Sequence, residues 1–243
     1  MRFEDASFAA KELEEWIQAE GITPHSVDRI MAALAISSSQ QYLQDPGLQH
    51  PFLMIPRLTS SPWHDVNHFS FLKPVFDNAE GMGTELAQCL SVAAAQLHPE
   101  AAIFQGAWHR FMFFNRGTAF TRNLARCPIT RSVLDAIPGA SVCGWVYFSI
   151  LGPATTIKPH CGAHNGKLRL HFTFTAPGEG CTLTVGGETR CWHKGEAFVF
   201  DDSFLHSAAN ATQAHRAVLL CDFWHPDLTE IERASLIFLR NKF

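Results

Sequence analysis

Apolar residues recur with a helical period near the start of the chain. One apolar face includes Leu13 and Trp16, and a second extends over residues 30–35. Further amphipathic segments lie at 83–97 and 228–241. We therefore expect helices at both ends of the chain, packed around whatever lies between them.

The pattern changes from about residue 108 to short runs rich in Val, Phe, Trp and Thr, separated by Gly, Pro and Asn. A spacing of about ten residues, with no long helix between the runs, favours an antiparallel sandwich or barrel. The mouth of a small barrel is a common ligand site. The predicted strands are WHRFMFF (108–114), CGWVYFSIL (143–151), KLRLHFTF (167–174), CTLTVGG (181–187), TRCWHKG (189–195), EAFVFD (196–201) and AVLLCDFW (217–224).

Length and charge narrow the classes of protein. With 243 residues, of which 47% are hydrophobic and 17% charged, the chain can form one globular domain with a helical extension. The formal net charge of -4 gives no general attraction to nucleic acids or anionic membranes, so we expect neither as a partner.

The cellular compartment can be predicted from the chain's start and its cysteines. The charged, amphipathic start lacks the pattern of a signal peptide, and no segment has the pattern of a membrane span. Seven cysteines without a CxxC motif indicate mostly reduced thiols. We expect a cytoplasmic protein, with a Cys181–Cys191 pair across a hairpin left open.

Two histidines have the setting of metal ligands. His160 follows a proline at a turn between strands, and His206 follows the predicted strand EAFVFD. In a jelly roll, such a separation can bring both imidazoles to one barrel mouth, where neutral imidazole suits Fe(II), Cu, Ni or Zn. Gly162 stands two residues after His160, where the common two-histidine iron site carries a carboxylate.

Two arginines and a third histidine suggest an anion site in the same barrel. Arg216 begins a strongly apolar strand, where a buried guanidinium needs a carboxylate partner from the protein or a ligand. Arg169 and His171 lie two residues apart on one strand and therefore face the same side. Two imidazoles and two guanidiniums in one pocket suit a dicarboxylate co-substrate.

Three long motifs resemble the aspartyl/asparaginyl β-hydroxylase family. They are YFSILGPATTIKPHCGAHNGKLRLHFTF, FVFDDSFLHSAANATQAHRAVLL and DFWHPDLTEIERASL, in register over about 145–236, with a weaker match upstream to about residue 51. The resemblance implies a mostly β protein with flanking helices. Its core would be a double-stranded β-helix (a cupin-like jelly roll) over residues 51–243, preceded by an N-terminal helical extension over 1–50.

The resemblance also implies cofactors and residue roles. Members of the family are oxygenases that depend on Fe(II), 2-oxoglutarate and O2. His160 and His206 match the iron ligands, and Gly162 matches the glycine of animal members, whose iron site has two histidines and no carboxylate. We therefore expect a loosely held metal. The positions that hold 2-oxoglutarate in the family are matched by Ser149, Arg169, His171 and Arg216.

Two further positions bear on the substrate. Lys167 shares a strand face with Arg169 and matches a basic position near the substrate. Tyr147 replaces a lysine that helps to bind the substrate carboxylate in the animal enzymes, and this departure weakens the case for aspartate as the substrate.

Other polar residues have simpler interpretations. Asp201 and Asp202 suit a turn, or the orientation of His206, better than direct metal ligation. Cys161 should point away from His160 on an extended segment and be inert. We expect no ligands among His164, His193 and His215, and surface positions more than substrate contacts for Arg110, Arg116 and Arg122.

The leading hypothesis is a hydroxylase of an unactivated C–H bond in a small amino-acid-like or carboxylate-bearing molecule, within a biosynthetic pathway. The same iron chemistry supports halogenation, desaturation or cyclisation, and a catalytically silent jelly-roll binding protein is the alternative from another class. A zinc hydrolase is disfavoured because the sequence has no HExxH motif. The sequence assigns neither an oligomeric state nor a role for residues 1–50.

Overall fold

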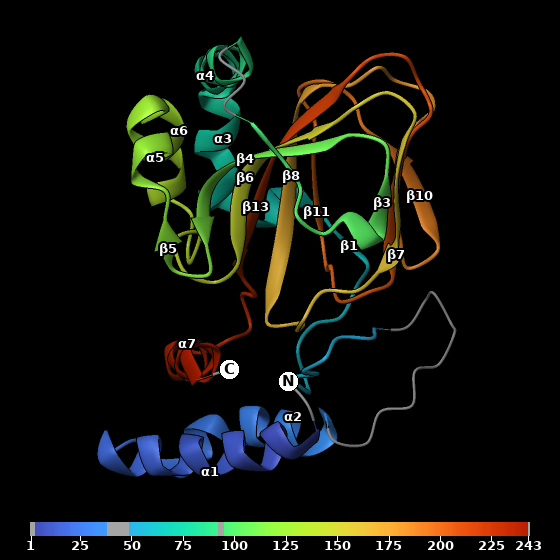
Figure 1. Ribbon diagram of the computed structural model, residues 1–243. Helices are drawn as coiled ribbons and strands as arrows, with labels where there is room; N and C mark the ends of the chain where they lie inside the picture. The colour runs from blue at the N-terminus through green and yellow to red at the C-terminus, as the bar shows by residue number, and fades with distance from the viewer. Residues whose placement is uncertain (1–2, 38–48, 92–94, 243) are drawn as a thin grey trace.

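The computed structural model describes residues 3–37, 49–91 and 95–242, as a two-sheet β core with helices on one side and below it (Figure 1). The helices are α1 (Phe3–Ala19), α2 (Asp28–Ser37), α3 (Lys73–Asp77), α4 (Ala79–Ser91), α5 (Thr121–Arg126), α6 (Pro128–Asp135) and α7 (Glu230–Lys242). The strands are β1 (Trp63–His64), β2 (Gln96–Leu97), β3 (Phe104–Gln105), β4 (Trp108–Asn115), β5 (Thr118–Ala119), β6 (Trp145–Leu151), β7 (Thr155–His160), β8 (Lys167–Thr175), β9 (Cys181–Val185), β10 (Glu188–Cys191), β11 (Ala197–Phe200), β12 (His206–Asn210) and β13 (Arg216–Trp224).

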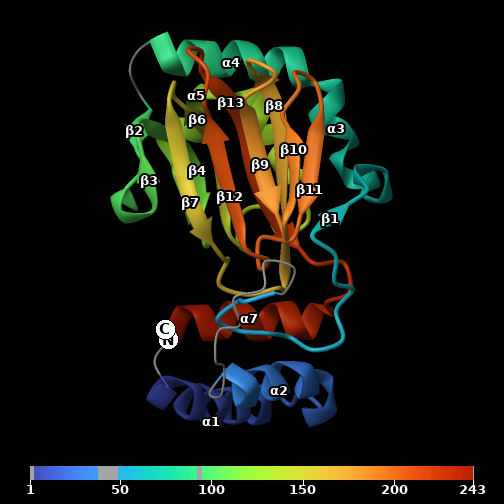
Figure 2. The same ribbon diagram turned by 90° about the vertical axis from the view of Figure 1, so that its right-hand side faces the viewer.

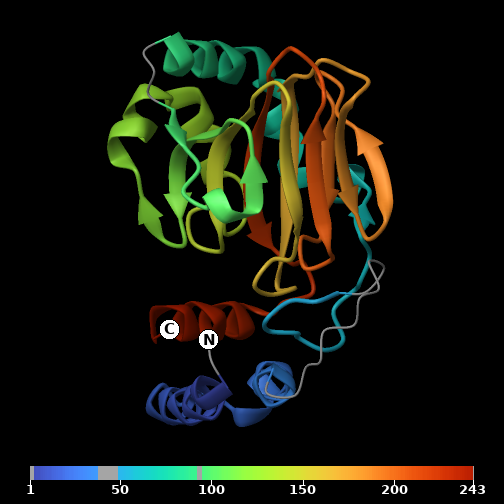
Figure 3. The ribbon, with the colours of Figure 1, turned by 45° about the vertical axis from the view of Figure 1, so that its right-hand side comes forward.

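Strands β6 to β13 alternate between two facing antiparallel sheets, except that β9 and β10 form a hairpin within one of them (Figures 2 and 3). The larger sheet has the order β1-β11-β8-β13-β6-β4-β2, and the smaller has the order β10-β9-β12-β7-β3. This winding is that of a double-stranded β-helix, so the predicted jelly-roll core with flanking helices is confirmed.

Alternating side chains explain why the larger sheet has helices on only one face. Along β6, Tyr147 and Leu151 pack in the apolar cluster between the sheets. Val146, Phe148 and Ile150 point the other way, into a cluster shared with α3 to α6. Because neighbouring residues of a strand face opposite sides, one segment supplies both the barrel interior and the core beneath the helices.

The N-terminal helices pack on α7 and not on the sheets. Figure 2 shows α7 below the open end of the barrel, with α1 and α2 on its far side. Trp16 of α1 stacks on Phe238 of α7 with ring centroids 5.1 Å apart. Leu13 and Leu34 share an apolar cluster with Leu236. The division at residue 50 stays a prediction, but the extension and α7 have a common core.

Some predicted elements differ from the observed ones. The strands β7 and β12 were not expected, because HSAAN has little β-branched character and β7 contains Lys158 and Pro159. The amphipathic segment 83–97 forms a helix only to Ser91, and its end at Gln96–Leu97 pairs with β4 instead. Helices α5 and α6 were also not predicted.

Two broader expectations can be compared with the structure. All seven cysteines are free thiols, so no Cys181–Cys191 disulfide is present. Within the described ranges, no helix has the length and apolar character needed to cross a membrane.

Glu232 ties the start of α7 to α2 and provides a test of this packing. Its carboxylate accepts from the Thr229 backbone N–H, while the Thr229 hydroxyl accepts from the Glu232 N–H, which is a capping box. The same carboxylate is paired with Arg29. We expect Glu232→Ala to lower the free energy of unfolding by roughly 2–3 kcal/mol, because the cap and a charged hydrogen bond are lost together.

Urea unfolding monitored by circular dichroism measures this loss. Glu230→Ala is the matched control, since Glu230 is an exposed acidic residue of the same turn. Equal effects of the two substitutions would contradict a special role for Glu232.

Candidate active site

The two predicted metal ligands lie opposite each other on neighbouring strands. His160 is the last residue of β7 and His206 the first of β12, and the antiparallel register pairs them directly. Their ring centroids are 4.2 Å apart. Each Nδ1 lies within hydrogen-bond distance of a backbone carbonyl two residues earlier, at 2.8 Å from Lys158 O and 2.9 Å from Phe204 O. Donation from Nδ1 leaves the Nε2 lone pairs available to a metal.

Both imidazoles are held neutral. Burial lowers the pKa of His206 to about 3, with a further contribution from the neighbouring His160. Burial also lowers the pKa of His160. A neutral imidazole is the form that binds a metal, so the residues present fit a two-histidine Fe(II) site. Among the described residues, no group of three or more His, Cys, Asp or Glu side chains is placed to hold a metal ion.

Gly162 is required by the position of Asp202. A Cβ added to Gly162 would lie 2.5 Å from Oδ1 and 2.7 Å from Oδ2 of Asp202. The Gly162 N–H also donates to the Asp202 backbone carbonyl at 2.6 Å. The space in which a carboxylate side chain at position 162 would begin is therefore filled by a carboxylate from the other side of the barrel mouth.

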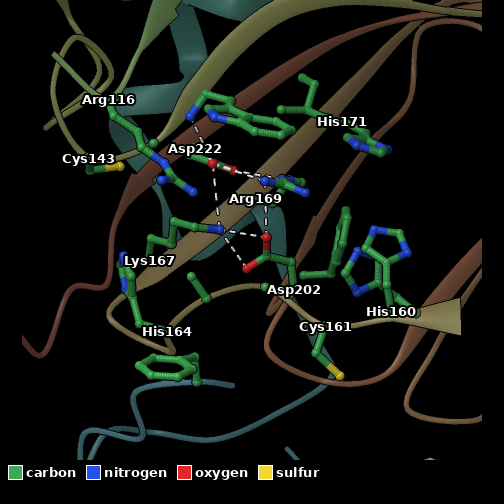
Figure 4. A pocket seen from close by; sticks show the side chains of 18 of the residues that line it. Arg116, Cys143, His160, Cys161, His164, Lys167, Arg169, His171, Asp202 and Asp222 are labelled. Atoms are coloured by element: carbon green, nitrogen blue, oxygen red, sulfur yellow. Dashed lines mark hydrogen bonds and ion pairs between the residues drawn. The ribbon is translucent and has the colours of Figure 1, made fainter. Parts of the chain in front are cut away.

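Four charged side chains form a buried network next to the histidines (Figure 4). Lys167 donates to Asp202 at 2.6 Å and lies 3.5 Å from the carboxylate of Asp222. Arg169 binds Asp222 through Nε at 2.6 Å and lies 3.0 Å from Asp202. Burial alone would raise the pKa of Asp202, but Arg169 and Lys167 hold that pKa well below its usual range.

This network changes the expectation for the two basic residues of β8. Arg169 was predicted to bind 2-oxoglutarate, and Lys167 to lie near the substrate. Both line the cavity, but the guanidinium of Arg169 is already paired with two protein carboxylates, and the ammonium of Lys167 is paired with the same two. Asp222 is a partner of Arg169 because the two residues lie opposite each other in the β13–β8 register.

Among the described residues, Arg216 has no carboxylate partner. Its side chain is 1% exposed, and Nη1 donates to the backbone oxygen and hydroxyl of Ser149, at 3.3 and 3.2 Å. The guanidinium also interacts with the thiol of Cys181. Its guanidinium lies over the ring of Trp192, 4.4 Å from the centroid. Burial lowers the pKa of Arg216 to about 10, so the group still carries its charge at neutral pH. A buried cation of this kind calls for an anionic ligand.

His171 and Ser149 complete the surroundings of Arg216. Both ring nitrogens of His171 are buried and have no hydrogen-bond partner among the described residues. The hydroxyl of Ser149 accepts from Trp108 Nε1 at 3.0 Å and from Arg216, which leaves its own proton free to donate. Arg216, His171 and Ser149 therefore each have an unused hydrogen-bond donor, and the oxygens of a bound carboxylate could accept from them.

The remaining predicted residues are spread between the cavity and the surface. Tyr147 is 1% exposed and lines the cavity, where burial raises the pKa of its hydroxyl. The expectation of a turn is confirmed for Asp201, which accepts from the Ser203 N–H. Burial raises the pKa of Cys161 to about 11, as suits an inert thiol. The cavity also touches His164 and Arg116, although Arg116 is exposed, as expected from the sequence. His193, His215 and Arg122 are exposed and lie outside the lining, and Arg110 is half-buried outside it.

Sequence reasoning missed Asp222, Trp108 and Trp192. Asp222 could have been found from alternation alone, because it lies on the same face of β13 as Arg216. Trp192 carries no comparable signal, since it lies just beyond the end of β10 and only the winding of the chain brings it under Arg216.

Acidification should destabilise the metal-free protein. Burial lowers the pKa of His98 and of His206 to about 3, and that of His171 well below its usual value. The unfolded chain takes up these protons near pH 6.5 and the folded chain does not, so stability is full above that pH and is lost as pH falls. Each histidine contributes about 1.4 kcal/mol per pH unit below 6.5. Asp201 opposes this trend, because burial raises its pKa to about 6.

Urea unfolding at about pH 7, 6 and 5 measures the slope. We expect His98→Gln to make the slope shallower and His193→Gln, an exposed control, to leave it unchanged. A free energy of unfolding that stays level down to pH 5 would contradict the neutral state of these side chains.

Known proteins with similar sequences place the chain in a family. A protein-family model described as aspartyl/asparaginyl beta-hydroxylase matches residues 77–226, more than half of the chain. The human aspartate beta-hydroxylase domain-containing protein 2 is 39% identical over 140 residues, which are 55% of this chain and 38% of that protein. The human aspartyl/asparaginyl beta-hydroxylase is 34% identical over 134 residues, which are 54% of this chain and 18% of that protein.

The matched region is thus well under half the length of these curated relatives. Among solved structures, a prolyl-4-hydroxylase from Pseudomonas putida has a TM-score of 0.40 and 15% identity, and the match covers 63% of this chain and 98% of that one. A likeness at this level does not identify a relative.

Proposed function

The chain belongs to the aspartyl/asparaginyl β-hydroxylase family, and from this premise we propose that it is an Fe(II)- and 2-oxoglutarate-dependent dioxygenase. It hydroxylates an unactivated C–H bond of a small amino-acid-like or carboxylate-bearing substrate. The observation that carries this function is one cavity that holds both a neutral histidine pair and a buried arginine without a carboxylate partner.

His160 and His206 are the metal ligands in this function. Their Nδ1 atoms face backbone carbonyls, which fixes the ring orientation and leaves both Nε2 atoms for the metal. When bound there, Fe(II) supplies the oxidation chemistry that consumes O2 and 2-oxoglutarate. The protein contributes the ligands, the orientation of the reactants and a cavity that restricts water.

Arg216, His171 and Ser149 anchor the far carboxylate of 2-oxoglutarate. The guanidinium of Arg216 offers a charge-assisted hydrogen bond from its buried Nε, and His171 and Ser149 have unused donors beside it. Arg169 acts one step away, because its ion pair with Asp202 holds that carboxylate against Gly162, while its ion pair with Asp222 fixes the guanidinium. We therefore assign Arg169 a positioning role, unlike the direct contact that the sequence suggested.

Lys167 and Tyr147 lie on the substrate side of this cavity. The ammonium of Lys167 is neutralised by Asp202, so it is a weak site for a substrate carboxylate. We propose a free small molecule as the substrate. A residue of a protein substrate would have to enter the same cavity. The cytoplasmic location expected from the sequence stays a prediction.

The test is conversion of 2-oxoglutarate to succinate by the purified chain, loaded anaerobically with Fe(II) and then exposed to O2 with ascorbate. A panel of amino acids, carboxylic acids and short peptides is then added. Turnover that rises with one panel member supports the hydroxylase and gives its substrate class. Absence of both iron binding and succinate would favour a catalytically silent jelly-roll binding protein.

Product analysis distinguishes the outcomes of the same chemistry. A product that carries chlorine only when chloride is present would indicate halogenation. A product two mass units below the substrate would indicate desaturation or cyclisation. Hydroxylation adds one oxygen atom from O2, which labelled oxygen identifies.

A further inference from the structure

The cavity continues beyond the metal and anion sites to a second end that the proposed function does not use. Its volume is about 850 Å³, in the upper part of the usual range for pockets that bind drug-sized ligands. At this end, Arg116 on the β4–β5 turn and Arg240 on α7 line the same space as Cys143 and Trp224. There is room for a substrate next to the co-substrate.

Arg116 has an unfavourable backbone conformation. The two-residue turn between β4 and β5 has φ of 47° at Arg116 and 89° at Gly117, and the Arg116 N–H donates to Gly144 O at 2.7 Å. Asn-Gly is the favoured pair in such a turn, because an ordinary side chain is strained at positive φ. Backbone strain of this kind concentrates at functional sites.

Arg116 is an exposed residue whose side chain lines the cavity beside Cys143 (Figure 4). Over the described ranges, its guanidinium has neither a carboxylate partner within ion-pair distance nor a hydrogen-bond acceptor, in contrast to Lys167 and Arg169 nearby. An arginine that projects into a cavity without a partner can pair with a ligand anion.

Arg240 brings a second guanidinium to the same end. It is half-buried, with Nη1 donating to Val142 O and with Nε and Nη2 donating to the side-chain oxygen of Asn241, at 3.2 and 3.0 Å. Its neighbours therefore supply neutral acceptors, and Nη2 would lie only 3.1 Å from a Cβ added at Gly117. Burial lowers the pKa of Arg240, and the positive charge of Arg116 lowers it further. Two like charges are thus close together with no protein carboxylate between them among the described residues.

Apolar side chains line the cavity near this basic end. Trp224 and Leu53 are buried members of the apolar cluster that joins the barrel to α7, and Leu236 of α7 belongs to the same cluster. A ligand that reaches from the histidine pair toward the arginines would meet apolar surface before it meets charge. Such a lining favours an apolar segment with an anionic end group.

We propose that Arg116 and Arg240 bind an oxyanion, carboxylate or phosphate, at the end of the substrate remote from the oxidised carbon, and that the substrate is an anion with an apolar body. This assignment rests on the proposed function, because the histidine pair defines where oxidation occurs. It makes α7, and the N-terminal helices that support it, part of the substrate site.

The test is equilibrium binding to the full chain by isothermal titration calorimetry, with decanoate, decyl phosphate and 1-decanol as probes. We expect both anions, or one of them, to bind more tightly than the alcohol. Tighter binding of decanoate indicates a carboxylate substrate, and tighter binding of decyl phosphate indicates a phosphate. The assignment is overturned if the alcohol binds as well as both anions, or if none of the probes binds.

Arg116→Asn isolates the guanidinium. Asparagine tolerates positive φ, so this variant should unfold at the same temperature as the wild type or higher. We expect anion affinity to fall roughly 10- to 100-fold, the loss of one charged hydrogen-bonding group, with the affinity for 1-decanol unchanged. Arg122→Asn, which removes an exposed arginine outside the cavity, is the matched control. Unchanged anion affinity in Arg116→Asn would overturn the assignment.

The same measurements separate this site from the proposed function. His160→Ala should keep its affinity for the anionic probes, because the arginines are untouched. An active oxygenase whose anion affinity does not depend on Arg116 would leave the proposed function standing and reject only the oxyanion site.

Discussion

Replacing Arg216 with methionine is expected to abolish 2-oxoglutarate binding and yet make the ligand-free protein more stable. The guanidinium is 1% exposed, has no carboxylate partner among the described residues, and has an unpaired Nε. Burial lowers its pKa to about 10, the direction expected when the charged form is penalised. Methionine fills a similar volume without this penalty, so the free energy of unfolding should rise by roughly 1–3 kcal/mol.

The same substitution should weaken the binding of 2-oxoglutarate, because it removes the cation that pairs with the ligand's carboxylate. We expect the affinity for 2-oxoglutarate to fall by more than about 100-fold, since truncating one partner of a buried charge pair costs several kcal/mol. Urea unfolding of the ligand-free protein and titration calorimetry with 2-oxoglutarate measure the two effects separately.

Arg169→Met is the matched control within the same barrel. Arg169 is paired with Asp202 and Asp222, so its removal leaves two buried carboxylates short of a partner. This substitution should destabilise the protein by about 3–5 kcal/mol, opposite in sign to Arg216→Met. If both substitutions destabilise the ligand-free protein equally, Arg216 is a structural residue and the anion site is misplaced.

Replacing either His160 or His206 with alanine is expected to lower succinate formation by more than about 100-fold. Losing a residue that merely orients a metal ligand already costs about 10- to 100-fold in metal affinity or activity. The proposed site has two protein ligands, and the described residues include no group of three or more His, Cys, Asp or Glu that could hold a metal ion. Succinate formation with Fe(II) and metal content after dialysis measure the effect. With two ligands, we also expect chelator washes to remove iron from the wild type.

His164→Ala provides the control for the histidine variants. His164 lines the same cavity, but its Nδ1 accepts from the Gly166 N–H and it is not paired with the other two rings. It should retain most of the succinate formation. Equal losses in all three alanine variants, or tightly bound iron in His206→Ala, would show that the metal is held elsewhere.

The kind of fold and the chemistry of the site followed from local sequence. Strand-length apolar runs separated by turn residues predicted an antiparallel sandwich or barrel, because period-two alternation is typical of a sheet with one face in a core. The motifs around His160 and His206 identified the family, and that resemblance carried the candidate ligands and Arg216.

The sequence did not predict which buried arginine pairs with a carboxylate of the protein. Arg169 and Arg216 look similar along the chain, since each is an arginine among the apolar residues of a strand. The register of β13 with β8 places Asp222 beside Arg169, and no strand delivers a carboxylate to Arg216. One arginine is therefore neutralised by the protein, and the other remains available to a ligand.

By itself, the sequence determined an antiparallel β architecture and the supply of histidine and cationic side chains, because these depend on residue type and short-range periodicity. The family resemblance of its motifs added the jelly-roll class and the two candidate ligands. Only the tertiary structure decided that Asp202 fills the space beside Gly162, that α7 brings Arg240 to the cavity, and that Arg116 faces it. These contacts join residues far apart in the sequence, and their geometry depends on strand register and helix packing, which residue type alone does not specify.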